Sequence, residues 1–329
     1  MFEKKGKGIL LCLGLGTIAY FAGKEIPLLG SSIFGILSGI IIGNIVKLPT
    51  SFKAGINYSG KKLLQYGIIL LGASLNLVKI WEVGSQSFFV MLGTLLIALF
   101  SAFAFGKILG VEWNLQALIG AGTGICGGSA IAAVAPAIEA EDAEIAYAIS
   151  VIFLYNVLAV LIFPFFGRLL GLSQMAFGLW AGTAINDTSS VVAAAYSYGD
   201  IAGDYATIVK LTRTTMIIPI ALSFALYTAW KKKSSAETKY DVKKIIPWFV
   251  IWFLVAACLN SLGIISPDIG KSISSIGKFL IVVALTAIGL KTDIKQFKKA
   301  GFKPLLLGAL VWGAVIFSSL LIQFLTGQL

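Results

Sequence analysis

The chain has 329 residues, of which 58% are apolar and only 12% are charged, whereas soluble proteins carry about 25% charged residues. With a mean hydropathy of +0.92 it predicts an all-α polytopic membrane protein, and its 36 glycines suit close helix packing in lipid. The absence of histidine and the wide separation of the three cysteines exclude a His-ligated zinc, a Ser-His-Asp triad and a disulfide framework, so we expect no metal and no cofactor.

Eleven apolar segments follow one another along the chain, and most have the ~20 residues that a helix needs to cross the hydrocarbon core. They span residues 8–22, 28–46, 63–80, 86–109, 115–137, 145–167, 176–198, 205–230, 245–263, 275–296 and 304–325.

Basic residues are distributed unevenly between the loops that join these segments. With eleven crossings, one face receives most lysines and arginines, and the other receives only Lys24, Lys79 and Lys271, with Lys278 at a segment end. The positive-inside rule therefore predicts a multi-pass protein of the cell (inner) membrane. Its N-terminus would be cytoplasmic and its C-terminus outside. The net charge of +11 is then topogenic, and we expect no nucleic-acid partner.

Two internal similarities organise the chain further. Residues 60–84 match residues 277–301 without a gap, so that Gly60 and Gly72 fall on Gly277 and Gly289. The matched segments are the third and the tenth, which would cross in opposite directions, as in an inverted repeat. We expect one integral membrane domain over residues 1–329. Its approximate halves would be 23–167 and 176–329, with a cytoplasmic basic linker at 231–244.

The second similarity pairs two short motifs. AGTGICGGS, from Ala121 to Ser129, matches AGTAINDTS, from Ala181 to Ser189. If segments 115–137 and 176–198 each cross once, they run parallel; if both are re-entrant, they enter from opposite faces and can meet at the midplane. The sequence leaves both topologies open.

Glycine is concentrated in the first motif. Each glycine costs a helix interior up to ~1 kcal/mol relative to alanine, so five of them between Gly120 and Gly128 predict a broken helix. Its free backbone groups and half-helix ends would bind an ion. The alternative is close helix packing through small residues. We predict substrate binding by residues of both motifs, namely Thr123, Gly124, Cys126, Gly127, Gly128, Ser129, Thr188 and Ser189.

Three charged residues lie within the two apolar segments 176–198 and 205–230. Asp187 lies deep in an apolar span, where an ionisable group is a functional candidate, and with Asn186 it is predicted to hold the coupling ion. A structural pair with Lys210 or Arg213 is the alternative. Lys210 and Arg213 lie one helical turn apart and are predicted to compensate an oxyanion. Snorkelling to the headgroups is the alternative for them.

Asparagines occur in several of the other spans. We predict that Asn44, Asn76, Asn156 and Asn260 form hydrogen bonds between helices rather than binding a ligand.

Three stretches together resemble a known family. TGICGGSAIAAVAPAI at 123–138 followed by EAED, AGTAINDTSSVVAAA at 181–195 and VKLTRTTMIIP at 209–219 are similar to the YeiH-like family of proposed sulfate exporters. That family is grouped with cation:proton antiporters and anion transporters. The resemblance extends over the whole chain and implies an inverted-repeat fold with discontinuous helices near the midplane. The functional positions that the resemblance implies, carried over by motif, are Thr123 to Ser129, Asn186 to Ser189, Lys210 and Arg213.

These features together predict a secondary transporter and not an enzyme. Its substrate would be a small anion such as sulfate, sulfite or an organosulfonate, coupled to H⁺ or Na⁺ by alternating access. A transporter of another organic anion, a channel subunit or a membrane enzyme are the alternatives. The expected partners are the anion, the coupling ion and membrane lipid, and the sequence leaves a homodimer open.

Overall fold

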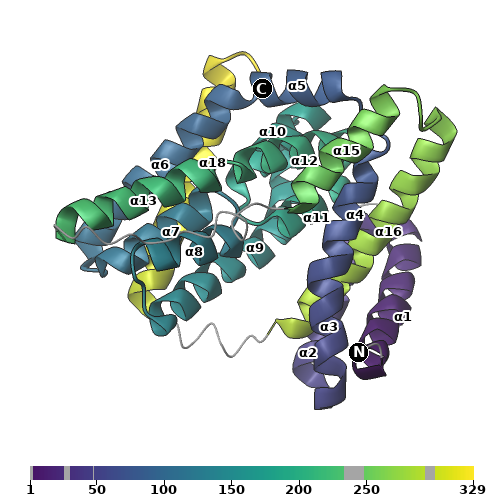
Figure 1. Cartoon of the computed structure of the whole chain (residues 1–329), viewed down its shortest axis with the longest axis horizontal. Coiled ribbons are helices and arrows are strands. Elements are labelled where there is room, and N and C mark those ends of the chain that lie inside the picture. Colours follow the sequence, from purple (N-terminus) through teal and green to yellow (C-terminus); the bar gives the residue numbers. More distant parts are fainter. Residues whose placement is uncertain (1–2, 26–29, 47, 233–247, 293–300) are drawn as a thin grey trace. The chain divides into compact units, whose positions relative to one another are not determined.

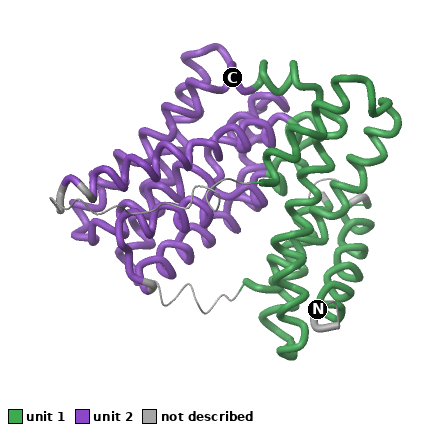
Figure 2. The backbone as a smooth tube through the Cα atoms, viewed as in Figure 1, with its two compact units in different colours: residues 1–83, 192–204, 248–294 green, residues 84–191, 205–247, 295–329 purple. Residues whose placement is uncertain are grey.

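The computed structural model describes residues 3–25, 30–46, 48–232, 248–292 and 301–329, and the regular structure within these ranges is helical (Figure 1). The predicted linker at 231–244 lies almost wholly outside the described residues, as does the end of the predicted repeat 277–301. The chain divides into two compact units (Figure 2). Unit 1 comprises residues 1–83, 192–204 and 248–294, and unit 2 comprises residues 84–191, 205–247 and 295–329.

The compact units interleave along the sequence, so neither corresponds to one predicted half of the chain. The predicted halves describe a repeat relationship between sequences, whereas the units describe packing, and the inverted repeat stays a prediction.

Unit 1 is built around one long helix, α16, which packs against α1, α2 and α4. Its core includes Cys12, Ile56, Val283, Ala287 and Leu290. The helices that belong wholly to this unit are α1 (Glu3–Glu25), α2 (Gly30–Ile45), α3 (Thr50–Tyr58), the π-helical turn η1 (Ser59–Leu63), α4 (Leu64–Gly72), α15 (Trp248–Ser261) and α16 (Pro267–Lys291).

Glycines meet where helices of unit 1 pack most closely. A Cβ on Gly39 of α2 would lie 2.9 Å from the Cα of Gly289 on α16, and one on Gly67 of α4 would lie 2.9 Å from the carbonyl oxygen of Gly277. Real Cβ contacts are essentially never this short. The glycine content therefore allows close backbone approach of apolar helices, as the composition predicts.

Unit 2 encloses α7 and α10 with longer helices, since α6, α9 and α18 all pack against α7, and α18 also packs against α10. Every residue of α7 from Leu115 to Gly124 is buried, as is every residue of α10 from Ala176 to Ala184. Its helices are α6 (Phe88–Leu109), α7 (Trp113–Gly124), α8 (Gly128–Val134), the 3₁₀ turn η2 (Ala135–Ala137), α9 (Asp142–Leu169), α10 (Gln174–Ala184), α13 (Ile217–Lys232) and α18 (Phe302–Leu325).

Three further helices, α5 (Leu77–Gln86), α11 (Thr188–Tyr198) and α12 (Asp200–Thr214), contribute residues to both units.

The described residues of the eleven predicted segments lie mostly on helices, but fewer than eleven of these helices are long and apolar enough to be candidate membrane spans. Six helical stretches are long and apolar enough to span a membrane, or seven if one bent pair is counted. The six are Lys5–Gly23, Phe88–Leu109, Ala143–Leu169, Asp200–Thr228, Pro267–Lys291 and Phe302–Leu325. Eleven crossings are therefore not confirmed, because breaks divide several segments into helices shorter than a bilayer is thick.

The predicted span at 63–80 is wrong as a single straight helix. The stretch Thr50–Gly72 is followed by α5 at an angle of 106°. Asn76 begins α5 because its Oδ1 accepts the backbone N–H of Val78 at 2.7 Å, which is the contact of a helix N-cap. A local cap thus replaces the interhelical hydrogen bond that we predicted for Asn76.

The other three asparagines do bond between elements, as predicted. Asn44 of α2 donates to the carbonyl of Thr292 at 2.7 Å, and Asn260 of α15 donates to that of Leu75 at 3.1 Å. Asn156 of α9 accepts the backbone N–H of Asp187 at 3.0 Å, so it belongs to the candidate site.

Candidate functional site: two broken helices held by buried cations

Two helical stretches are broken at equivalent positions of the short repeated motif, and both breaks lie in unit 2. The first break, residues 125–127, separates α7 from α8, and the second, residues 185–187, separates α10 from α11. Both breaks are three residues long and occupy the same positions when Ala121–Ser129 is aligned with Ala181–Ser189. The predicted discontinuous helices are therefore present.

Gly127 makes the first break possible. Its φ of 70° and ψ of −131° lie in a region that residues with a Cβ rarely adopt. Its N–H donates to the carbonyl of Gly122 at 2.9 Å, and its carbonyl accepts the N–H of Ala130 at 3.1 Å and of Ile131 at 3.2 Å, which starts α8.

Gly120 and Gly124 serve packing instead, so a broken helix and close helix packing both apply to the motif, each to different residues. A Cβ on Gly120 would lie 2.8 Å from the Cβ of Ala102, and one on Gly124 would lie 2.9 Å from Cδ1 of Leu95. A Cβ on Gly128 would meet no atom within 4 Å among the residues that the structure describes, so packing does not require a glycine there.

Lys210 of α12 connects the two breaks. Its Nζ donates to the carbonyl oxygens of Ile125 and Ile185, both at 2.8 Å. These two carbonyls occupy the same position in the repeated motif, so one ammonium group donates a hydrogen bond to the equivalent carbonyl of each break.

Arg213 binds one turn further along α12. Its guanidinium donates to the carbonyls of Thr123, at 3.2 Å, and of Gly124 at the end of α7, and to that of Thr183 at the end of α10. Lys210 and Arg213 are both 0% exposed. Neither side chain reaches the surface as snorkelling requires, and both cations lie where helix C-termini expose unpaired carbonyls and negative partial charge.

Two residues of α18 complete the support of the second break. Trp312 donates from Nε1 to the carbonyl of Ala184 at 3.0 Å, and the Ser319 hydroxyl lies 2.7 Å from that of Thr183. We did not predict either residue, because both occur more than 100 residues away in an otherwise ordinary apolar span, and only the fold brings them to the break.

Asp187 lies at the start of α11 and caps that helix. Its Oδ2 accepts the backbone N–H of Ser189 at 3.0 Å and also the Ser189 hydroxyl. The carboxylate thus lies at the positive end of the α11 dipole. Within the described part of the chain it forms no ion pair with Lys210 or Arg213, which disfavours the structural-pair alternative.

Two polar side chains at the breaks are buried without a partner among the described residues. Both the Nδ2 and the Oδ1 of Asn186 lack a hydrogen bond, as does the Oγ1 of Thr123. Each residue is 1% exposed. Since an unsatisfied buried polar group costs roughly 1–3 kcal/mol, these atoms are available to a bound ion, substrate or water.

The remaining predicted residues lie around the same breaks. Cys126 is 2% exposed, and Thr188 and Ser189 are buried at the start of α11. Gly128 and Ser129 begin α8, where Ser129 is exposed. The breaks touch each other, because a Cβ on Gly127 would lie 3.2 Å from the Cβ of Asp187. Among the described residues no three His, Cys, Asp or Glu side chains gather as metal ligands.

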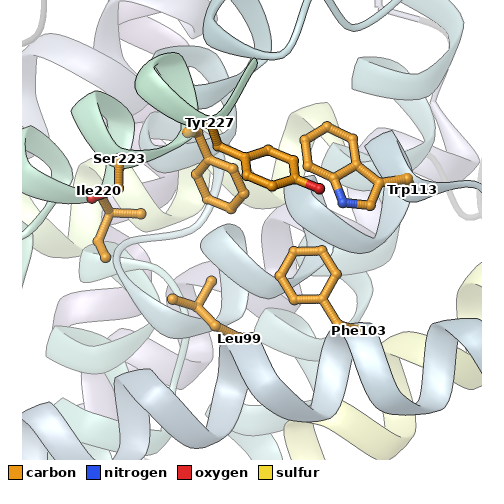
Figure 3. A pocket seen from close by; sticks show the side chains of 7 residues that line it. Leu99, Phe103, Trp113, Ile220, Ser223 and Tyr227 are labelled. Atoms are coloured by element: carbon orange, nitrogen blue, oxygen red, sulfur yellow. The ribbon is translucent and has the colours of Figure 1, made fainter. Parts of the chain in front are cut away.

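Unit 2 also contains an apolar cavity of about 410 Å³, which is not lined by residues of the breaks. It is lined by side chains that include Leu99, Phe103, Trp113, Phe224 and Tyr227, and Figure 3 shows the Trp113 and Tyr227 rings beside one another. Their centroids are 5.5 Å apart. A hard anion gains little from such a lining, so this cavity is not the candidate substrate site.

The fold and the site define a class: a polytopic α-helical membrane protein with two helices broken at equivalent positions of a repeated motif. A family model described as conserved hypothetical protein 698 matches residues 7–308. The chain belongs to this family, which is the YeiH-like family that its motifs resemble.

Relatives match the chain over nearly its whole length. A UPF0324 membrane protein of Clostridium tetani is 42% identical over 340 residues, covering 99% of both chains. One of Fusobacterium nucleatum is 44% identical over 340 residues, covering 97% of this chain and 98% of the relative. One of Streptococcus pyogenes serotype M6 is 42% identical over 332 residues, covering 98% of both. These relatives bear out the assignment to membrane proteins.

Proposed function

We propose that the protein is a secondary active transporter of a small anion, with sulfate, sulfite or an organosulfonate as the candidate substrates, driven by H⁺ or Na⁺. The observation that carries the proposal is the pair of equivalent breaks, with carbonyls that share Lys210 and with unpaired side chains beside them. Discontinuous helices with exposed polar groups are the usual substrate and ion sites of secondary transporters.

The charge of the breaks supports an anionic substrate. Two buried cations, Lys210 and Arg213, lie at the breaks with one carboxylate, that of Asp187. All three guanidinium nitrogens of Arg213 already donate to carbonyls. In this proposal the cations therefore attract the anion through their field, and direct donors come from unpaired or exposed groups such as the hydroxyls of Thr123 and Ser129.

The coupling ion is assigned to Asp187 and Asn186. Asp187 is only partly buried, and its carboxylate has hydrogen-bond partners on one oxygen, Oδ2. Asn186 next to it offers an amide oxygen that has no hydrogen-bond partner in the described part of the chain. Oxygen atoms of this kind suit Na⁺, and the carboxylate alone suits a proton.

The proposal includes a place and an orientation. The protein would lie in the cell membrane with its N-terminus cytoplasmic and its C-terminus outside, as the distribution of basic residues predicts. We propose no enzymatic activity, since a nucleophilic site here would require the Asp187 carboxylate to act alone as the base for the Ser189 hydroxyl, without the orienting third group of such sites.

Counterflow in proteoliposomes tests the proposal. Vesicles loaded with unlabelled sulfate or sulfite should accumulate the labelled anion transiently and in a saturable manner, which a channel or an enzyme would not produce. Asp187→Asn should abolish the dependence of this flux on pH or Na⁺. Asp268→Asn is the matched control, because Asp268 is an exposed carboxylate in the first turn of α16, and this variant should behave as wild type.

Two outcomes would contradict the proposal at different levels. Unchanged pH and Na⁺ dependence in Asp187→Asn would remove the coupling assignment. Absence of counterflow for sulfate, sulfite and organosulfonates would remove the substrate class.

A further inference from the structure

A second group of ionisable side chains lies in unit 1, apart from the breaks. Tyr196 of α11 donates its hydroxyl to Oδ1 of Asp204, on the first turns of α12, at 2.6 Å. Lys278 of α16 forms an ion pair of 2.6 Å with Asp200, and its Nζ lies 5.0 Å from the centre of the Tyr196 ring. These four residues form one connected cluster, which we call the Asp204 cluster.

Gly203, the residue before Asp204, allows the Tyr196 ring to pack directly against α12. A Cβ on Gly203 would lie 2.3 Å from Cδ1 of the ring, so the ring lies directly on the backbone of α12. The hydroxyl of Tyr196 is thereby fixed against the Asp204 carboxylate.

A polar cavity of about 130 Å³ adjoins this cluster. Its lining includes Tyr196, Asp200 and Lys278 together with the hydroxyl-bearing residues Ser31, Ser32 and Ser197. A water molecule takes up about 30 Å³ of liquid volume and needs two to four polar partners. The cavity therefore has the size and the lining to hold a few waters at the Tyr196 end of the hydrogen bond to Asp204.

The surroundings of Asp204 contain charges of both signs. Lys278 on α16, Lys79 on α5 and Asp200 on its own helix all interact with its carboxylate electrostatically, and Tyr196 on α11 donates a hydrogen bond. Lys278 is already paired with Asp200. Asp204 lies within a stretch that is apolar enough to span a membrane, where an ionisable group is a functional candidate.

We propose that Asp204 is a proton-binding carboxyl separate from Asp187, which exchanges its proton with water from the cavity beside its hydrogen-bond partner Tyr196, while Tyr196 orients it. On uptake, a proton from water forms an O–H bond with the carboxylate. On release, that bond breaks and the proton returns to water. The use of this proton in coupled transport rests on the proposed function, but its binding does not.

Infrared difference spectroscopy of the purified protein in lipid nanodiscs tests the binding directly. Acidification should produce the C=O stretching band of a protonated carboxyl, and Asp204→Asn should lose one such component. Tyr196→Phe should keep this component but move it to higher frequency, because the carboxyl loses a hydrogen-bond partner. Asp268→Asn is the matched control, because Asp268 is an exposed carboxylate in the first turn of α16 and lies outside the cluster, and it should retain the Asp204 component.

The proposal is overturned if the Asp204→Asn difference spectrum equals that of the wild type. It is also overturned if Tyr196→Phe leaves every carboxyl band unmoved, a test that holds even where Asp204→Asn does not fold. A titrating Asp204 band in a protein without anion counterflow would leave this inference standing and remove the proposed function.

Discussion

Replacing Gly127 by alanine tests how the first break is made. The backbone at Gly127 has φ 70° and ψ −131°, and a residue with a Cβ in such a sparsely populated region costs about 1–3 kcal/mol. The added Cβ would also lie 3.2 Å from the Cβ of Asp187, which is tighter than ordinary contact. We therefore expect Gly127→Ala to destabilise the protein by about 1–3 kcal/mol.

Gly128→Ala is the matched control, one residue away. A Cβ there would meet no atom of the described residues within 4 Å, and Gly128 is the first residue of α8. Alanine is preferred over glycine in a helix by up to ~1 kcal/mol. This variant should therefore be as stable as wild type or slightly more stable.

Unfolding of both variants in one detergent, followed by tryptophan fluorescence against temperature and denaturant, gives the comparison. We expect a lower unfolding midpoint for Gly127→Ala alone. Equal midpoints for the two variants would refute the assignment of the break to the conformation of Gly127.

Three further predictions concern the contacts around the breaks and the bend. Arg213→Lys should lower the unfolding midpoint, because the planar guanidinium reaches the carbonyls of α7 and α10 from three separate nitrogens, whereas an ammonium donates from a single nitrogen. Each carbonyl left unpaired costs roughly 1–3 kcal/mol, and an unchanged midpoint would contradict this role. In a protein that keeps Cys126 as its single cysteine, maleimide should react slowly because Cys126 is 2% exposed. Lys210→Met should speed that reaction by about tenfold or more through loosening of the first break, and an unaltered rate would mean that Lys210 does not hold it. Asn76→Ala should destabilise by about 1 kcal/mol through loss of the α5 cap, measured against Asn44→Ala, which removes the bond to Thr292 but no cap.

The broken helices could be predicted from the sequence because their signal is local. Glycine in a helix has a known cost, and the match between Ala121–Ser129 and Ala181–Ser189 marks a second break whose own sequence contains only one glycine, Gly182. Burial of both breaks followed from the chemistry of lipid, which cannot satisfy free backbone groups.

The partners of the breaks could not be predicted because they depend on packing. Lys210 and Arg213 were identified as site residues, but their hydrogen bonds to backbone carbonyls follow from the position of α12, which no local pattern encodes. Trp312 and Ser319 gave no signal at all. A single capping hydrogen bond at Asn76 likewise ends a span that hydropathy extends to residue 80.

Asp204 shows that the surroundings of an ionisable residue also depend on packing that the local sequence does not reveal. It occurs near the end of a predicted segment, where a carboxylate is ordinarily solvated. The structure places it against Tyr196, eight residues earlier in the chain and on another helix. Hydropathy averages over such a position, whereas function depends on the individual contact.

The central claim, coupled anion transport through the paired breaks, is tested most directly by charge movement in purified proteoliposomes after jumps of sulfate and sulfite. The account predicts a saturable transient in the wild type that is lost or becomes insensitive to pH and Na⁺ in Asp187→Asn, while Asp268→Asn retains it. A wild-type transient that Asp187→Asn reproduces with the same pH and Na⁺ dependence would contradict the account.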